Sequence, residues 1–244
     1  MRVRFLGSGD AFGSGGRFNT CFEVEATGAH FLIDCGASSM IALRRFGVDP
    51  NSLHCILITH LHGDHFGGLP FLLLDAQLVS RRSTPLTIAG PPGLQARLDT
   101  VMEAFFPGST AIPRRFALEI VELPAGVAQP IGGLTVTPYE VKHACGAPPY
   151  ALRIEAGGKV VTYTGDTEWV ETLIPAARDA DLFICEGYFV DKAMKYHLDY
   201  ATVQRHLGEL APKRTIITHM SPGMLDHARA GGFEAAHDGL EVLL

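Results

Sequence analysis

Apolar positions along the chain follow two periodicities, which separate the expected strands from the expected helices. Short apolar or alternating runs typical of β-strands occupy residues 2–6, 21–25, 30–34, 55–58, 86–89, 116–123, 134–142, 150–155, 159–164, 182–185, 214–218 and 239–244. Apolar residues spaced three or four apart, typical of helices, occupy residues 69–79, 94–105, 170–177 and 203–210, and a further helix is expected at 37–46. This pattern predicts an α/β protein.

The strands form two successive groups, residues 1–123 and 124–244, and helices follow the strands in each group. Glycine and proline are spread along the chain, and no low-complexity linker divides it. We therefore predict one domain, residues 1–244, in which two β-sheets pack face to face between helices.

The composition narrows the class of protein. With 47% apolar and 19% charged residues, the chain can bury a substantial core. No apolar run reaches the roughly 18 to 20 residues that cross a bilayer, and the first residues lead into a strand rather than a signal peptide, so we expect a cytoplasmic protein without membrane contact. Five scattered cysteines predict reduced, buried thiols, and the net charge of −6 argues against a large nonspecific nucleic-acid surface.

The segment Thr59–His65 follows the apolar run at 55–58 and is rich in metal-binding side chains. Its three imidazoles and one carboxylate suit zinc or a similar divalent ion, and they belong to His60, His62, Asp64 and His65. These side chains cannot all converge from a regular strand, whose successive residues point to opposite faces. A loop at the end of a strand can turn them inward, and two adjacent ions can share them.

Three more expected strands end in a residue that can bind a metal. His143 follows the strand at 134–142, Asp166 follows 159–164, and His219 follows 214–218. Ligands at strand ends are held by a rigid scaffold, so we expect these ends to meet at one rim. Together with the motif they make seven candidate ligands, which is enough for two ions.

Two other segments are expected near this rim. The glycine-rich segment 7–16 lacks the spacing of a nucleotide-binding loop and precedes a strand, so we interpret it as a loop that borders the site. Asp34, at the end of a strand, has two interpretations of equal weight. It either orients a metal-binding imidazole or caps the helix expected at 37–46.

The motif His-x-His-x-Asp-His, followed by a spaced His, Asp and His, resembles the metallo-β-lactamase superfamily, in the branch typified by ribonuclease Z and related phosphodiesterases. The resemblance covers nearly the whole chain. It implies an αββα sandwich of two mixed β-sheets and two divalent ions, of which zinc is expected first and manganese or iron are alternatives. It assigns His60, His62 and His143 to the first ion, Asp64, His65 and His219 to the second, and Asp166 as the bridge.

The same branch carries a proton-donating pair, and Glu186 and His197 match its two positions. We count Glu186 and His197, together with Asp64, as the catalytic residues. The match departs from the branch at Cys185, where histidine is usual, and at Leu198-Asp199, where Ser-Thr is usual.

The resemblance implies hydrolysis of a phosphodiester by a hydroxide that bridges two ions about 3.5 to 4 Å apart. Ribonuclease Z enzymes carry a long arm before the bridging aspartate that grips transfer RNA. Here only residues 144–165 separate His143 from Asp166. We therefore expect a small or single-stranded substrate, such as a short nucleotide phosphodiester, rather than transfer RNA. A homodimer is also implied.

Two alternatives stay open at this point. Carbon-ester hydrolases, such as lactonases, thioesterases and β-lactamases, share the superfamily's metal centre. A non-catalytic metal-binding protein of the same fold is the second alternative, although all seven ligand types are intact.

Overall fold

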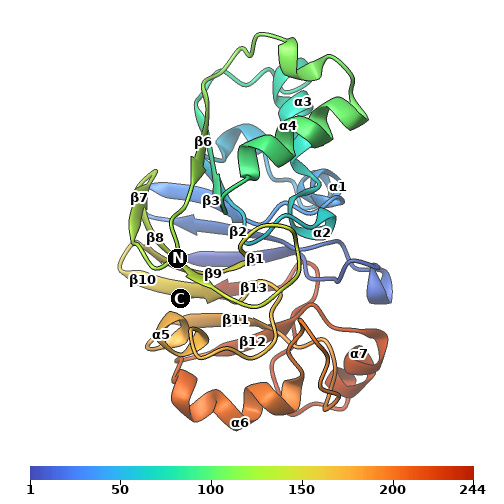
Figure 1. Ribbon diagram of the computed structural model, residues 1–244, viewed down its shortest axis with the longest axis vertical. Coiled ribbons are helices and arrows are strands. Elements are labelled where there is room, and N and C mark those ends of the chain that lie inside the picture. Colours follow the sequence, from blue (N-terminus) through green and yellow to red (C-terminus); the bar gives the residue numbers. More distant parts are fainter.

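The computed structural model describes residues 1–244, with two β-sheets stacked face to face between helices (Figure 1). The α-helices are α1 (Ser39–Arg45), α2 (Gly63–Phe66), α3 (Leu69–Leu78), α4 (Leu94–Phe105), α5 (Leu173–Ala177), α6 (Tyr200–Leu210) and α7 (Pro222–Arg229). In Figure 1, α1, α3 and α4 cover one sheet at the top, and α5 and α6 cover the other at the bottom. This arrangement confirms the predicted αββα sandwich of two mixed sheets.

The first sheet has seven strands in the order β13-β1-β2-β3-β4-β5-β6. They are β1 (Arg2–Gly7), β2 (Cys21–Ala26), β3 (Ala29–Ile33), β4 (Cys55–Leu57), β5 (Leu86–Gly90), β6 (Leu118–Glu122) and β13 (Glu241–Leu243). The expected division into two successive strand groups is wrong for β13, which pairs antiparallel with β1. It crosses to this sheet because Val242, opposite Val3, adds a buried side chain to the core between the sheets.

The second sheet has six strands in the order β12-β11-β10-β9-β8-β7. They are β7 (Gln129–Ile131), β8 (Leu134–Glu140), β9 (Tyr150–Ala156), β10 (Lys159–Tyr163), β11 (Leu182–Glu186) and β12 (Thr215–Thr218). The pattern of apolar residues does not predict β7, since this edge strand has only three residues, one of them Pro130.

Apolar side chains fill three layers of core. One lies between the sheets and includes Phe22, Phe31 and Tyr163, and one lies on the outer side of each sheet beneath its helices. All five cysteines are free and buried, as predicted. None of the helices combines the length and the apolar character needed to span a membrane.

Helix α6 begins three residues before the expected range 203–210, because a capping residue precedes it. The Asp199 carboxylate accepts a hydrogen bond from the backbone N–H of Thr202 at 2.8 Å and starts α6. Helix α1 starts two residues later than expected, and α5 three residues later. Helix α7 was not predicted, because only Met224 and Leu225 of its residues are buried and they give no repeated apolar spacing.

The strands of the second sheet deliver their carboxyl ends to one edge. Strands β10, β11 and β12 are parallel, and β8 and β10 are both antiparallel to β9, so all four run in the same direction. The segments after β4, β8, β10 and β12 carry the seven predicted ligands, which gather at this edge. The two sheets therefore meet at the site described next.

Candidate metal centre

The loop after β4 turns the motif residues toward a common point. His60 follows the strand, His62 stands just before α2, and Asp64 and His65 lie within that short helix. The ring centroids of His60 and His65 are 4.0 Å apart, and those of His60 and His62 are 5.0 Å apart. His60 and His65 are fully buried. The loop therefore brings side chains together that a straight strand would send to opposite faces.

The second sheet completes two groups of side chains. In the first group, Nε2 of His143 lies 3.0 Å from Nδ1 of His62, with His60 alongside. In the second, Nε2 of His219 lies 3.3 Å from Oδ2 of Asp64, and Nε2 of His65 lies at the same distance from that oxygen. Within each group the potential ligand atoms lie within 4.8 Å of one another.

Asp166 stands between the two groups. Its Oδ1 lies 3.2 Å from Nε2 of His65, and its Oδ2 lies 3.4 Å from Nε2 of His219. Oδ2 is also 3.9 Å from Nε2 of both His60 and His143. The Asp166 carboxylate thus lies within 3.9 Å of imidazole nitrogens from both sets.

Three atoms at this point are buried without a hydrogen-bond partner: Nε2 of His60, Nε2 of His65 and Oδ1 of Asp166. Buried polar atoms are almost always satisfied, so a cluster of unsatisfied ones indicates a missing partner. Imidazole nitrogens and carboxylate oxygens at this spacing are the donor set of zinc and similar ions. The residues therefore fit divalent metal ions.

The charges of the cluster also favour added cations. Burial lowers the pKa of His60 well below its ordinary value, which favours a neutral imidazole able to bind a metal. Burial also opposes a charge on His65, but the carboxylates of Asp166 and Asp64 raise its pKa well above the ordinary value. Two buried carboxylates thus hold protons on nearby imidazoles, and divalent ions would replace those protons.

Asp34 orients one of these imidazoles. Its Oδ2 lies 2.6 Å from Nδ1 of His65, and its Oδ1 and Oδ2 accept hydrogen bonds from the N–H and hydroxyl of Thr59, both at 2.8 Å. Ser38, not Asp34, stands at the start of α1. Of the two interpretations of Asp34, the structure therefore supports the orienting one, which leaves Nε2 of His65 directed at the cluster.

Glu186 and His197 lie beside the cluster and contact each other. Oε2 of Glu186 lies 2.9 Å from Nδ1 of His197, and its Oε1 accepts a hydrogen bond from the N–H of Thr167. The ring centroid of His197 is 5.1 Å from that of His143 and 5.8 Å from that of His219. The structure therefore brings together the pair that the sequence singled out.

The contact between Glu186 and His197 also affects the pKa of each group. Burial by itself would lower the pKa of His197, but the hydrogen bond and negative charge of Glu186 raise it above the ordinary value. Burial raises the pKa of Glu186, together with the charge of Asp166. The contact with Glu186 therefore favours the protonated form of the His197 imidazole.

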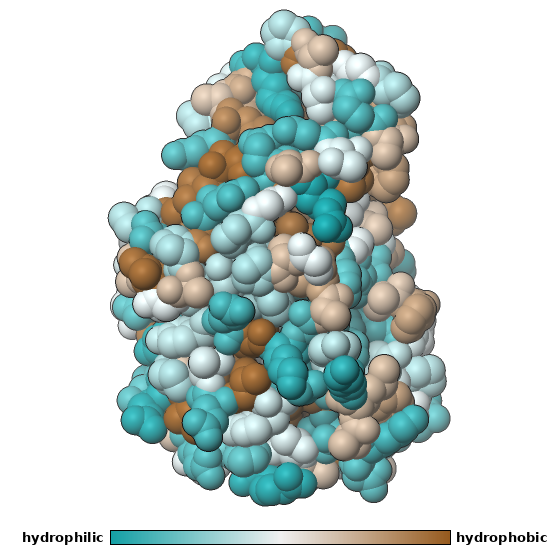
Figure 2. All heavy atoms as spheres, viewed as in Figure 1, coloured by the Kyte–Doolittle hydropathy of each residue, from teal (hydrophilic) through white to brown (hydrophobic).

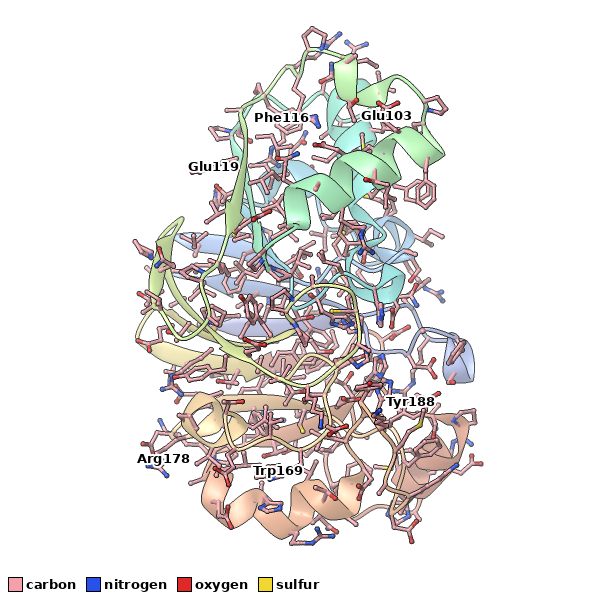
Figure 3. All side chains as sticks on the ribbon, in the orientation of Figure 1. Glu103, Phe116, Glu119, Trp169, Arg178 and Tyr188 are labelled. Atoms are coloured by element: carbon pink, nitrogen blue, oxygen red, sulfur yellow. The ribbon has the colours of Figure 1, made fainter.

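A cavity of about 230 Å³ opens onto the cluster. Its walls include six of the predicted site residues. They are the imidazoles of His62, His143, His197 and His219 and the carboxylates of Asp64 and Asp166. Ala11 and Phe12 also line it, which confirms that the glycine-rich segment borders the site. Tyr188 and Met194, which line it as well, were missed, although Tyr188 follows Glu186 by only two residues (Figure 3).

The fold and the site define a metal-dependent hydrolase of the metallo-β-lactamase superfamily, in its ribonuclease Z-like branch. Among solved structures, the chain superimposes on human tRNase Z, short form (TM-score 0.81, 24% identity, 100% of this chain and 99% of that one). It also superimposes on the metallo-β-lactamase fold protein YhfI from Bacillus subtilis (TM-score 0.78, 20% identity, 99% of each chain). The family described as anti-Pycsar protein Apyc1 matches residues 1–237, and the chain belongs to this family.

Curated relatives agree with this placement. Ribonuclease Z of Agathobacter rectalis is 26% identical over 277 residues, covering 92% of this chain and 89% of that protein. Ribonuclease Z of Mycobacterium sp. (strain KMS) is 29% identical over 227 residues, covering 88% and 73%. The predicted superfamily, branch and class of enzyme are therefore confirmed, while the preference against transfer RNA stays a prediction.

Proposed function

We propose that this protein, acting as one domain of residues 1–244, is a phosphodiesterase for a small or single-stranded phosphodiester and uses two divalent ions. The observation that carries the proposal is the contact of His197 with Glu186 beside the seven clustered side chains. A phosphodiester releases an alkoxide, which needs a proton. His197 lines the cavity and contacts Glu186, so its imidazole can donate that proton as a general acid. We expect zinc as the resident metal, with manganese or iron as alternatives, and a homodimer as the assembly.

The proposed ligand sets follow the two groups. His60, His62 and His143 would hold one ion, Asp64, His65 and His219 the other, and Asp166 would reach both. When bound, such ions supply an activated water and neutralise charge on the phosphoryl oxygens. Asp34 keeps the His65 ring in place, and the carbonyl of Tyr196 accepts a hydrogen bond from Nδ1 of His143 at 2.9 Å. Both contacts leave Nε2 of the ring free to bind metal.

His197 is the proposed proton donor. Since Nδ1 faces Glu186, its Nε2 is the nitrogen available to a substrate in the cavity. Glu186 is fully buried and fixed by Thr167, so it holds the ring and stabilises the charged imidazolium. In this arrangement His197 passes a proton from Nε2 to the departing oxygen, and Glu186 keeps the imidazole in the orientation that makes the transfer.

The absence of an insertion supports a small substrate. Most of residues 144–165 form the β9–β10 hairpin, which pairs along its length within the second sheet. No additional arm projects from this part of the chain. The walls of the cavity are therefore the proposed contacts for substrate.

The test is turnover of purified protein loaded with zinc or manganese. The panel contains bis(p-nitrophenyl) phosphate and a short dinucleotide, and beside them thioesters, lactones and a β-lactam. We expect hydrolysis of the phosphodiesters. Faster turnover of a carbon ester would move the protein to the second hydrolase class, and inactivity on the whole panel with two ions bound would favour a binding protein.

A further inference from the structure

Glu168 contacts two other segments of the candidate site, although it belongs to neither proposed ligand set and is not one of the predicted catalytic residues. It lies in the segment after β10. Its Oε1 forms an ion pair with Nζ of Lys142 at 2.7 Å, next to His143 in the segment after β8. Its Oε2 accepts a hydrogen bond from the N–H of Tyr196 at 3.0 Å, next to His197 in the segment after β11. One side chain therefore joins three segments that carry predicted site residues.

Tyr196 has a backbone conformation that needs support from its neighbours. Its φ is +72°, in the left-handed region, which is costly for a residue with a large side chain. It lies in a tight turn, because Met194 and His197 pair through their backbones on either side. Its N–H donates to Glu168, and its carbonyl accepts a hydrogen bond from Nδ1 of His143 at 2.9 Å. The contact with Glu168 therefore helps to hold the turn in a conformation that tyrosine rarely adopts.

This turn supports two parts of the proposed mechanism through consecutive residues. The carbonyl of Tyr196 fixes the His143 ring, whose Nε2 lies 3.0 Å from Nδ1 of His62 in the cluster. The next residue is His197, whose Nδ1 contacts Glu186 at 2.9 Å. A shift of the turn would therefore move a candidate metal ligand and the proposed proton donor at the same time.

The ion pair between Lys142 and Glu168 is open to solvent. The Lys142 side chain is 58% exposed and that of Glu168 is 25% exposed. Figure 2 shows polar residues spread over much of the face in view. Ion pairs that water reaches in this way contribute little stability. The hydrogen bond from the Tyr196 N–H is therefore the contact of Glu168 that matters for the site.

We propose that Glu168 is a positioning residue, whose hydrogen bond with the Tyr196 N–H places His143 to bind metal and His197 to donate a proton. This inference rests on the proposed phosphodiesterase function, in which His197 is the acid. Glu168 does not line the cavity over the cluster, so it acts through the turn. Its loss should therefore appear both in metal affinity and in proton transfer.

The test compares Glu168→Ala with Glu168→Gln, which keeps an oxygen for the Tyr196 N–H. Zinc affinity is measured by chelator competition, and kcat/KM is measured at saturating zinc for a dinucleotide and for bis(p-nitrophenyl) phosphate. We expect Glu168→Ala to weaken zinc affinity about threefold to tenfold, less than removal of a direct partner of a metal-binding imidazole. It should also slow the dinucleotide about threefold to tenfold more than the nitrophenyl ester, whose leaving group needs no proton. Glu168→Gln should restore most of both properties.

Two variants serve as controls. Glu103, on α4 and labelled in Figure 3, also accepts backbone N–H hydrogen bonds, from Gly108 at 2.8 Å and Thr110 at 3.0 Å, but it lies outside the cavity. Glu103→Ala should leave zinc affinity and the ratio of the two rates unchanged. Lys142→Ala removes the ion pair but keeps the hydrogen bond of Glu168, so both values should stay close to those of the wild type. A loss as large as that of Glu168→Ala would overturn the assignment to the turn.

Two results on an active enzyme would overturn the proposal for Glu168. One is a Glu168→Ala protein with wild-type zinc affinity and an unchanged ratio of the two rates. The other is a Glu168→Ala protein that loses both rates equally at full metal loading and has a lower free energy of unfolding, as expected for a purely structural role. Failure of the zinc-loaded wild type to hydrolyse either ester would refute the phosphodiesterase function. The zinc affinity of Glu168→Ala would then still test the effect of Glu168 on His143, so the two failures are distinguishable.

Discussion

Replacing His197 with alanine removes the one imidazole in the cavity wall that belongs to neither proposed ligand set. The metal groups should stay intact, so the loss reports on proton transfer alone. General acid catalysis is worth about 10²- to 10⁴-fold in rate. Because the His197 side chain is 18% exposed, water can partly replace it, and we expect the lower end of that range, about 10²- to 10³-fold.

The leaving group decides whether this loss appears. For a dinucleotide, which releases an alkoxide, His197→Ala should cost about 3 to 4 kcal/mol of transition-state stabilisation. For bis(p-nitrophenyl) phosphate, whose phenolate leaves without a proton, the loss should be less than about tenfold. The assay is kcat/KM for both esters, with metal content measured on the same samples.

Two further variants sharpen this comparison. Glu186→Gln keeps a hydrogen-bonding group beside Nδ1 but removes the negative charge, so its loss on the dinucleotide should be intermediate. His206→Ala removes a histidine outside the cavity, stacked on Trp169 at 3.7 Å between centroids, and should change neither rate. Equal losses on both esters in His197→Ala would refute the acid role and leave a structural one.

Three other changes test the rest of the site and the scaffold. Asp166→Ala should reduce metal content, measured by mass spectrometry, together with activity on every ester, and a fully loaded, active variant would contradict the bridging assignment. Asp34→Ala removes the carboxylate that orients the His65 ring, and it should weaken metal affinity by about 10- to 100-fold in a chelator competition. Asp49→Ala, which changes a surface aspartate, should leave metal affinity unchanged. Glu23→Gln should lower the free energy of unfolding at pH 7 by about 1 to 3 kcal/mol. Burial of Glu23 opposes its charge, but the hydrogen bond to His30 and the charge of Arg4 hold its pKa below the ordinary value. The stabilisation is therefore present above the unfolded-state pKa of Glu23 and is lost as the pH falls through its lowered folded-state pKa. Urea unfolding that shows the same difference between wild type and variant at pH 7 and pH 3 would contradict this.

The ligand cluster was predictable because its signal is local. A buried strand that ends in histidine or aspartate places that residue at the sheet edge, and the run from His60 to His65 is dense enough to indicate metal without any structure. The three strands of the second sheet that end in a candidate ligand, β8, β10 and β12, run in the same direction, so their ends meet at one edge. The structure brings the predicted residues together, while their roles as ligands stay a prediction.

Features that depend on distant pairing were missed. Strand β13 looks like any C-terminal strand, and only the open edge of β1 directs it to the first sheet. Tyr188 and Met194 carry no signal in their neighbours, because their place in the cavity wall depends on where their loop lies relative to Ala11 and Phe12 from the start of the chain. Their place became visible only when those loops were placed side by side.

Each proposed ion takes ligands from both sheets, since His60 to His65 follow β4 while His143, Asp166 and His219 follow strands of the other sheet. Bound ions would therefore link the two sheets to each other. In chain order, the set of His60, His62, His143 and Asp166 is complete before the other set, which also needs His219. A chain that stops before Asp166 thus has no complete site for either ion, and one that stops before His219 lacks a ligand of the second site only.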